Sequence, residues 1–252
     1  MIDIHSHLVY DVDDGSQNIE ETLHMINEAY NAGFTDIILT PHYMQNFYIK
    51  ESMEISNKID NIKEHIKNLK INLYHGNEIY ANENLINFIK EKKAVSLVGS
   101  KYILFELPIQ ENPLNLEEIV YLILENGYIP IIAHPERYRY VQENPNMLID
   151  YIERGVLFQA NYGSIIGLYG TKTKETVKKL LSHNMIHFLG SDNHFPNSIY
   201  KKMPEILISL KKIIGEEKLE EISTINPSKI LKNEIIDIDS PSSIKKGFLG
   251  LF

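Results

Sequence analysis

The segment that most constrains this chain is Asp-Ile-His-Ser-His at residues 3–7. Its apolar start predicts a β-strand, and residues two apart on a strand point to the same face. His5 and His7 should therefore project together where the strand ends, so that one divalent metal ion can bind both imidazoles. The alternative is a polar strand end with two solvated histidines. An acidic loop that contains Asp13 and Asp14 follows, and this favours the metal site.

Apolar segments with strand and helix periodicity alternate along the rest of the chain. We predict strands at residues 1–5, 34–39, 71–74, 102–107, 129–133, 156–160 and 186–189. We predict helices at residues 18–32, 50–69, 83–92, 115–127, 144–154 and 172–184, with further helices near 203–213 and 216–222. Such alternation implies parallel strands joined by right-handed crossovers. The fold class is therefore α/β, either a (β/α)7 TIM-like barrel or an open, doubly wound sheet.

A set of histidines and carboxylates lies at or just after the predicted strand ends: His5, His7, Asp14, His42, Glu78, Glu106, His134, Asp192 and His194. We favour the barrel because a closed barrel brings this many strand ends to one point. Imidazoles and carboxylates are suitable ligands for manganese, iron or zinc. At three or four protein ligands per ion, the set suggests two or three ions.

Each of these residues also has a structural explanation. A single histidine at a strand end is more often a hydrogen-bonded structural residue than a ligand, and Glu78 could be a surface acid at a turn. Glu106 is harder to explain in this way, because a carboxylate inside a buried strand is costly unless it is paired or bound to a metal. Asp14 has acidic neighbours, so spacing alone does not distinguish it from Asp13 as the ligand.

Composition excludes several classes of protein. The chain of 252 residues has a formal net charge of −9 and no cysteine. The charge disfavours a nucleic-acid partner, and the lack of cysteine excludes disulfides, thiolate zinc sites and a cysteine nucleophile. Without an 18-residue apolar run or a signal peptide, we expect a cytoplasmic protein with no integral membrane segment. We expect one barrel domain at residues 1–239 and a tail at 240–252, which either packs or is disordered, or else docks on a partner or membrane surface.

Two arginines, Arg137 and Arg139, follow His134 closely. The planar guanidinium group of arginine suits bidentate recognition of phosphate oxygens. We predict that Arg137 is a catalytic residue that binds a substrate phosphate. For Arg139 we favour a surface salt bridge to Glu136 or Glu143.

Seven motifs spread along nearly the whole chain together resemble a known family. They lie at residues 3–7, 10–16, 40–42, 76–78, 105–108, 133–137 and 191–194. The resemblance is to the PHP (polymerase and histidinol phosphatase) superfamily, and within it to the manganese-dependent protein-tyrosine phosphatases of bacterial capsule and exopolysaccharide gene clusters. The Asp-Val-Asp-Asp-Gly loop and the His-Pro-Glu-Arg motif are specific to this subgroup. The resemblance implies a distorted (β/α)7 barrel, the PHP fold, with three metal ions, expected to be Mn²⁺.

The resemblance also implies how the ligands are divided. One ion would be held by His5, His7, Glu78 and Asp192. Glu78 would bridge to a second ion, which Glu106 and His134 complete. The third ion would be held by Asp14, His42 and His194, and Asp3 would orient a ligand from behind.

The sequence departs from the family pattern after the last of these histidines. Family members usually have asparagine at the next position and, five residues after the histidine, an arginine that helps to bind phosphate. Here these positions are Phe195 and Ile199. Lys201 or Lys202 could reach the phosphate instead, although lysine lacks the planar fork of arginine.

The metal site and the resemblance together predict hydrolysis of phosphomonoesters, with protein phosphotyrosine as the first-choice substrate. A hydroxide that bridges two metal ions would attack phosphorus in line, without a phosphoenzyme. The resemblance alone implies a bacterial tyrosine kinase of polysaccharide synthesis as the partner. The alternatives are a phosphatase for a small ester such as histidinol phosphate, and a metal-binding barrel with a regulatory role. Tyr43, Phe47 and Tyr48 either wall the substrate ring or simply pack the loop after His42.

Overall fold

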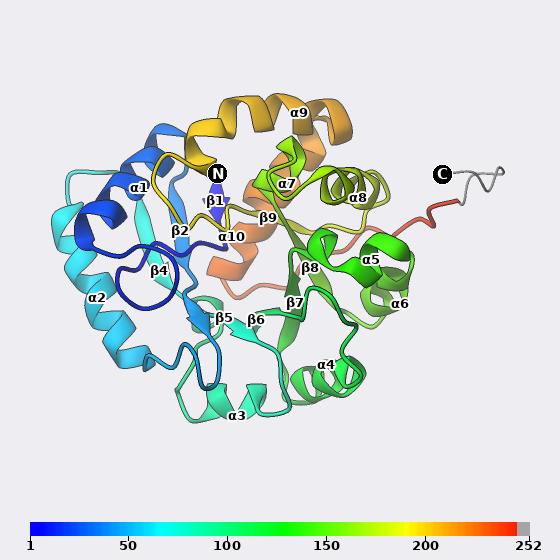
Figure 1. Ribbon diagram of the computed structural model, residues 1–252, viewed down its shortest axis with the longest axis horizontal. Helices are drawn as coiled ribbons and strands as arrows, with labels where there is room; N and C mark the ends of the chain where they lie inside the picture. The colour runs from blue at the N-terminus through cyan, green and yellow to red at the C-terminus, as the bar shows by residue number, and fades with distance from the viewer. Residues whose placement is uncertain (246–252) are drawn as a thin grey trace.

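Parallel strands form the centre of the molecule and helices surround them (Figure 1). The computed structural model describes residues 1–245. One sheet has the order β1-β2-β4 and a second has the order β3-β5-β6-β7-β8-β9, with parallel pairing in both. The strands are β1 (Ile2–Asp3), β2 (Asp36–Leu39), β3 (His42–Tyr43), β4 (Asn72–His75), β5 (Glu78–Tyr80), β6 (Tyr102–Glu106), β7 (Ile129–Ala133), β8 (Leu157–Asn161) and β9 (Phe188–Gly190).

Two of the predicted strands are each followed by a short strand that was not predicted, β3 after β2 and β5 after β4. We expected the second strand to stop before Pro41, but the chain forms a strand again at β3, which pairs with β5 so that His42 lies opposite Glu78. Asn77, which is buried, bridges this break. Its side-chain amide donates to the Pro41 carbonyl at 3.0 Å, and its side-chain oxygen accepts the N–H of Val95 at 2.9 Å. The sheet therefore changes course without leaving these backbone groups unpaired.

The barrel closes between the first and the last strand. The N–H of Asp192 donates to the His5 carbonyl at 2.8 Å, and the N–H of His7 donates to the Asn193 carbonyl at 3.1 Å. A glycine is required at position 190, because a Cβ there would lie 2.7 Å from the Cβ of His5. These contacts exclude the open sheet, so the prediction of an α/β barrel is confirmed.

Helices cover the outside of the barrel (Figure 1). They are α1 (Ile19–Asn31), α2 (Ser52–His65), α3 (Leu85–Lys90), α4 (Leu116–Glu125), α5 (Arg139–Glu143), α6 (Met147–Glu153), α7 (Tyr162–Ile166), α8 (Thr171–Ser182), α9 (Ile199–Glu220) and α10 (Asn226–Leu231). Shorter helical turns are η1 (Leu97–Gly99), η2 (Pro135–Arg137) and η3 (Glu221–Ile225). Asn18 caps α1 as predicted, since its side chain accepts the N–H of Glu21 at 2.9 Å.

Several helix predictions differ from the structure. The five-residue helices α5 and α7 are not predicted, because they are too short to show a periodic pattern. The helices predicted near 203–213 and 216–222 agree with the structure, because the label α9 spans two helices that are separated by a kink at Gly215, where φ is 79°. The helix predicted at 144–154 begins later, at Met147.

Apolar side chains pack both inside the barrel and between the barrel and its helices. The interior cluster includes Ile4, Ile38, Leu104, Ile131 and Phe188, and Ile230 of α10 belongs to it. The segment that follows α10 lies at the amino-terminal end of the strands, where the Tyr102 hydroxyl donates to the Glu234 carbonyl at 2.6 Å. Apolar packing thus fills the barrel below the carboxyl ends of the strands. Polar side chains gather above it, at the mouth where barrel active sites lie.

The last described residues return to the barrel surface. The N–H of Ser242 donates to the His183 carbonyl at 3.0 Å, and the Ile244 backbone forms two hydrogen bonds with the Asn146 side chain, at 2.8 and 3.0 Å. The first part of the predicted tail is therefore packed, and the rest of it, residues 246–252, lies outside the described residues. Within residues 1–245, none of the helices combines the length and the apolar character that a membrane span requires.

Candidate metal centre

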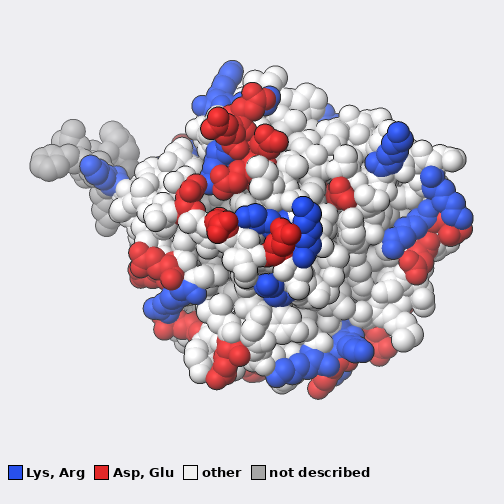
Figure 2. Space-filling model, turned by 180° about the vertical axis from the view of Figure 1, so that it is seen from behind, with Lys and Arg blue, Asp and Glu red and all other residues white. Residues whose placement is uncertain are grey.

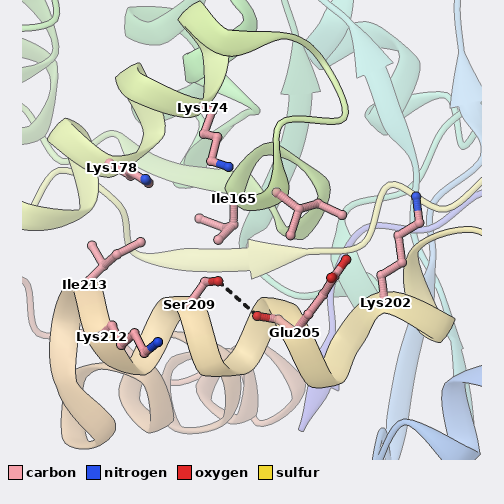
Figure 3. Close-up of a pocket in the computed structure, with 9 residues that line it drawn as sticks. Ile165, Lys174, Lys178, Lys202, Glu205, Ser209, Lys212 and Ile213 are labelled. Atoms are coloured by element: carbon pink, nitrogen blue, oxygen red, sulfur yellow. Dashed lines mark hydrogen bonds between the residues drawn. The ribbon is translucent and has the colours of Figure 1, made fainter.

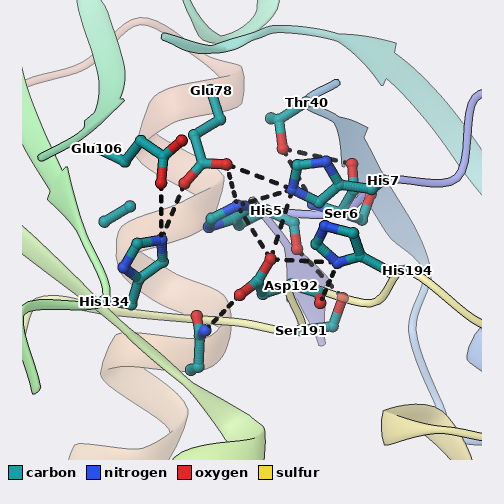
Figure 4. A network of polar contacts seen from close by, with 12 residues as sticks. His5, Ser6, His7, Thr40, Glu78, Glu106, His134, Ser191, Asp192 and His194 are labelled. Carbon is teal, nitrogen blue, oxygen red and sulfur yellow. Dashed lines mark hydrogen bonds and ion pairs between the residues drawn. The ribbon is translucent and has the colours of Figure 1, made fainter. Parts of the chain in front are cut away.

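The predicted ligand residues meet at the carboxyl-terminal mouth of the barrel, and Figure 4 shows His5, His7, Glu78, Glu106, His134, Asp192 and His194 around one centre. Three groups offer ligand atoms within 4.8 Å of one another: His7, Asp14, His42 and His194; His5, His7 and Asp192; and His42, Glu78 and Glu106. His134 belongs to none of these groups, but its Nε2 lies 3.0 Å from Glu78 Oε1. The structure thus brings all nine residues together from six separate stretches of the chain.

Glu78 occupies the centre of this cluster. Its Oε2 lies 3.0 Å from His42 Nδ1, 3.2 Å from His5 Nε2 and 3.4 Å from His7 Nε2. Oε2 and His42 Nδ1 are both buried, and neither has a hydrogen-bond partner in the described part of the chain. Buried polar atoms normally have such partners. Three ring nitrogens that converge on one carboxylate oxygen without a hydrogen bond to it form an arrangement that would suit a shared cation.

The outer side of the cluster is formed by Asp14 with two histidines. Asp14 Oδ1 lies 3.5 Å from the Nε2 atoms of both His42 and His194. Asp13, its neighbour, turns inward to a different contact, described below. The structure thus distinguishes Asp14, whose carboxylate faces the cluster, from Asp13, whereas the sequence spacing did not.

Glu106 and His134 complete the other side. Glu106 Oε1 lies 3.4 Å from His42 Nδ1, and Glu106 Oε2 lies 3.8 Å from His134 Nε2. Burial and then the nearby Glu78 raise the pKa of Glu106 to about 7, whereas burial and then Arg137 lower the pKa of His134 to about 4. A divalent cation between these groups would relieve the repulsion between the carboxylates and favour neutral imidazole. The donor set therefore fits a metal ion.

Two of these residues have an unusual backbone conformation. His134 has a φ of 35° and Asp192 has a φ of 51°, both in the left-handed region that non-glycine residues rarely adopt. Each follows the end of a strand, β7 or β9. Such strain persists where the surrounding structure enforces it, commonly at functional sites.

Two imidazoles are held from behind by residues that the sequence did not single out as partners. Asp13 Oδ2 lies 2.8 Å from His7 Nδ1, and Gln159 Oε1 lies 2.7 Å from His5 Nδ1. Partners of this kind fix the orientation and tautomer of a metal ligand. Gln159 carried a usable signal, since it is a polar residue within the apolar strand β8, as Glu106 is within β6.

Asp3, expected to orient a ligand, lies directly beneath the cluster. Its Oδ1 accepts the N–H groups of Ser191 at 2.9 Å and of His5 at 3.2 Å, and its Oδ2 accepts the Tyr200 hydroxyl at 2.8 Å. Asp3 thus holds together the two backbone segments that carry His5 and Asp192.

Arg137 borders the cluster. Its Nη1 donates to Asp192 Oδ2 at 3.0 Å, and its guanidinium carbon lies 4.7 Å from the centre of the Tyr169 ring. By contrast, Arg139 is exposed and pairs with Glu143 at 3.0 Å, one of the two partners considered for it.

A pocket of about 210 Å³ opens beside Asp192 and His194, and Arg137, Tyr169 and Phe195 are among its lining residues. Ile199, at the position where the family usually has arginine, also lines this pocket and is almost fully buried. Lys201 does not line it. Its ammonium group contacts Asn197 and lies 3.6 Å from Glu28, so its position does not support the predicted contact with phosphate.

The aromatic residues after His42 have three different surroundings. Tyr43 is buried against Phe88, with ring centres 5.0 Å apart. Tyr48 stacks on His42 at 5.6 Å, whereas Phe47 is 73% exposed. Of the three, Tyr48 is the one placed beside the cluster, and Tyr43 packs the loop.

A closed parallel barrel with a cluster of imidazoles and carboxylates at its strand ends defines this protein as a metallohydrolase barrel of the PHP class. Comparison with known sequences assigns the chain to a narrower family within this class. The chain belongs to the family of capsular polysaccharide synthesis proteins CpsB/CapC, whose profile matches residues 1–232. The family indicated by the sequence motifs is therefore confirmed.

Proteins named as tyrosine-protein phosphatases match this chain over nearly its full length. The putative tyrosine-protein phosphatase CapC of Staphylococcus aureus is 34% identical over 250 residues, which cover 96% of this chain and 95% of that protein. The tyrosine-protein phosphatase YwqE of Bacillus subtilis (strain 168) is 32% identical over 248 residues, which cover 98% and 97%.

Solved structures support the same relationship. A crystal structure from work on YwqE and on CpsB of Streptococcus pneumoniae, described as metal-dependent tyrosine phosphatases, matches with a TM-score of 0.90 at 31% identity and covers 98% of this chain and 100% of that chain. A histidinol phosphate phosphatase of Lactococcus lactis matches with a TM-score of 0.57 at 15% identity and covers 84% and 93%. At this low identity the second structure shows a shared fold.

Proposed function

We propose that this chain is a metal-dependent tyrosine-protein phosphatase of capsular polysaccharide synthesis. The observation that carries the proposal is the position of Glu78, whose Oε2 lies within 3.4 Å of nitrogens of three imidazoles. That centre lies in a chain that is similar along nearly its whole length to tyrosine-protein phosphatases. The substrate would be a phosphotyrosine protein, with a bacterial tyrosine kinase of polysaccharide synthesis as the proposed partner and the cytoplasm as the proposed location.

We propose that the cluster holds Mn²⁺ at three positions. His5, His7, Glu78 and Asp192 would hold the first ion; Glu78, Glu106 and His134 the second; and Asp14, His42 and His194 the third. The grouping of ligand atoms supports this division, because His5, His7 and Asp192 lie together, as do Asp14, His42 and His194. Glu78 faces His134 with Oε1 and the other imidazoles with Oε2, as a bridging carboxylate would.

The chemistry divides between the ions and the chain. When bound, the ions would supply Lewis acidity and would lower the pKa of water, so that hydroxide is available as the nucleophile near neutral pH. Arg137 lines the pocket beside His194 and would stabilise negative charge on the phosphoryl oxygens there. The ring of Tyr169 lies against its guanidinium group and would limit its motion. Tyrosine, with a pKa of about 10, is a fair leaving group, so a strong general acid is not required.

The test compares wild type with His42→Ala on a phosphotyrosine peptide in the presence of Mn²⁺. We expect release of phosphate by the wild type and a loss of about 100-fold or more in the variant, since a ligand is removed. Equal release by both proteins would refute the mechanism. Histidinol phosphate and other small esters, assayed in parallel, distinguish a protein phosphatase from a small-molecule one.

A further inference from the structure

A groove of about 580 Å³ lies between α7, α8 and α9, outside the metal centre. Figure 3 shows Lys174 and Lys178 of α8 facing Lys202 and Lys212 of α9, with Ile165 of α7 between them. Glu205 is the single acidic residue that lines it. The lining is therefore strongly positive in a chain whose formal net charge is −9.

The charges of the four groove lysines are not neutralised by ion pairs with other described residues. Within the described residues, none of the four forms an ion pair within 4.0 Å, and the one interaction drawn in Figure 3 joins Ser209 to the Glu205 carbonyl. The adjacent Lys211 on α9, in contrast, is paired with Glu216 at 2.6 Å. Figure 2 likewise shows positive and negative side chains interspersed on the face it displays. Four unpaired ammonium groups around one hollow produce a local positive potential that favours an anionic ligand.

The groove begins next to the pocket beside His194. Ile199 of α9 lines that pocket, and Lys202, about one helical turn further on, lines the groove. A second connection runs along α7 and the residues that follow it, because Ile166 lines the groove and Leu168, two residues later, lines the pocket beside His194. From Lys202 to Lys212 the helix rises by about 15 Å. An extended peptide covers that length with roughly five residues.

We propose that this groove, lined by Lys174, Lys178, Lys202 and Lys212, binds an acidic segment of the phosphoprotein substrate while its phosphotyrosine occupies the pocket beside His194. The proposal rests on the proposed phosphatase function. It identifies the preferred substrate by its chemistry: a phosphotyrosine flanked by several Asp or Glu residues. The apolar side chains of Ile165 and Ile213 line the same groove and can contact the aliphatic parts of the peptide.

The test uses the full chain loaded with Mn²⁺ and three substrates: a phosphotyrosine peptide flanked by Glu, the same peptide with Gln in place of each Glu, and p-nitrophenyl phosphate. The groove variant combines Lys174→Gln, Lys178→Gln and Lys212→Gln. The matched control combines Lys70→Gln, Lys90→Gln and Lys232→Gln, which are exposed lysines that do not line the groove. Both variants lose the same charge, so an effect of net charge alone would be equal in the two.

We expect wild type and control to prefer the Glu peptide about tenfold in kcat/KM, mainly through a lower KM, with the preference declining as salt is added. The groove variant should lose this preference and retain its activity on p-nitrophenyl phosphate. The affinity for the unphosphorylated Glu peptide, measured by fluorescence anisotropy, should also be lower in the groove variant.

Three results would overturn the proposal. The first is an equal KM for both peptides in wild type, and the second is an unchanged preference in the groove variant. The third is unchanged peptide kinetics together with lost binding to phosphatidylserine vesicles, which would assign the groove to a membrane surface. Failure of the proposed function is recognised separately, because wild type would then hydrolyse neither peptide nor p-nitrophenyl phosphate.

Discussion

Asp13 Oδ2 accepts a hydrogen bond from His7 Nδ1 at 2.8 Å and also accepts the backbone N–H of His42 at 2.9 Å. One buried carboxylate thus orients both the imidazole of His7, which follows β1, and the backbone of His42, which begins β3. Burial alone would raise the pKa of Asp13, but the charges and hydrogen bonds of His7 and His42 together outweigh burial and lower the pKa to about 2. Asp13 is therefore ionised at neutral pH, and His7 presents Nε2 to Glu78 and Asp192.

Asp13→Asn should weaken the metal centre without removing a proposed ligand. We expect metal affinity or activity to fall about 10- to 100-fold, the usual cost of losing a partner behind a ligand. Activity titrated against Mn²⁺ should show partial recovery at high metal concentration. Asp11→Asn is the control, because Asp11 lies in the same loop but is exposed and pairs with Lys58. Equal titration curves for Asp13→Asn and wild type would contradict the assigned role.

Arg137→Lys should lower kcat/KM on a phosphotyrosine peptide by about 100-fold, since lysine keeps the charge but loses the planar fork. Arg139→Lys should change it little, because Arg139 is exposed and pairs with Glu143. Steady-state kinetics of both variants on one substrate test this. A larger loss for Arg139→Lys than for Arg137→Lys would reverse the assignment.

Removal of metal should destabilise the fold as well as stop catalysis. Without a cation, the buried carboxylates at Glu78, Glu106 and Asp192 face one another across a small space. If metal is present at about 100 times its Kd, binding contributes about 3 kcal/mol, which corresponds to roughly 5–10 °C in Tm. Thermal unfolding in EDTA, and again after addition of Mn²⁺, measures this shift. An unchanged Tm in the presence of the chelator would argue against a bound metal at this centre.

We expect His187, which lies at the end of the barrel opposite the metal centre, to make the stability of the fold depend on pH. It is buried, its Nδ1 accepts the N–H of Phe158 at 3.0 Å, and burial, with a smaller effect of Lys218, lowers its pKa to about 3. Because an unfolded histidine has a pKa of about 6.5, the unfolded chain binds the extra proton between these values. The contribution of His187 to stability is therefore complete above pH 6.5 and is lost as the pH falls toward 3.

His187→Asn keeps an acceptor for Phe158 and removes this titration. Between pH 6.5 and 5, wild type should lose about 2 kcal/mol more unfolding free energy than the variant. Urea unfolding at several pH values gives the unfolding free energies of the wild type and of the variant. His65→Asn, at an exposed position at the end of α2, should follow wild type. Parallel pH profiles for wild type and His187→Asn would show that His187 is not the source.

The sequence was most informative where a strand ends in a chemically demanding residue. Glu106 within an apolar strand, and His134 directly after one, could be placed at the mouth because all strands of a barrel end there. Glu78 could be placed in the same way, but its central position between the imidazoles could not. That position depends on β3 pairing with β5 beyond a break in the sheet. Pro41 marks the break in the sequence, but no local pattern indicates that a strand resumes at His42.

The residues that support the cluster were harder to predict. Asp13 and Asp14 are adjacent and identical in type, so their different directions arise from the tertiary course of the loop. Tyr169, which packs on Arg137, lies in a segment after the five-residue helix α7, where no periodicity marks its orientation. Gln159 could have been found, since a polar residue in a buried strand needs a partner for the same reason as Glu106.

The contact between Asp3 and Ser191 spans 188 positions of the chain. During synthesis on the ribosome, β1 therefore cannot pair with the segment that carries Ser191 until most of the polypeptide has been made. Long-range pairings of this kind slow folding, because a large loop must close before the contact is gained. Until then His5 and His7 belong to an incomplete coordination shell. Metal loading should thus be a late, post-translational event, and a truncated nascent chain that ends before residue 191 should be unable to retain its full complement of ions.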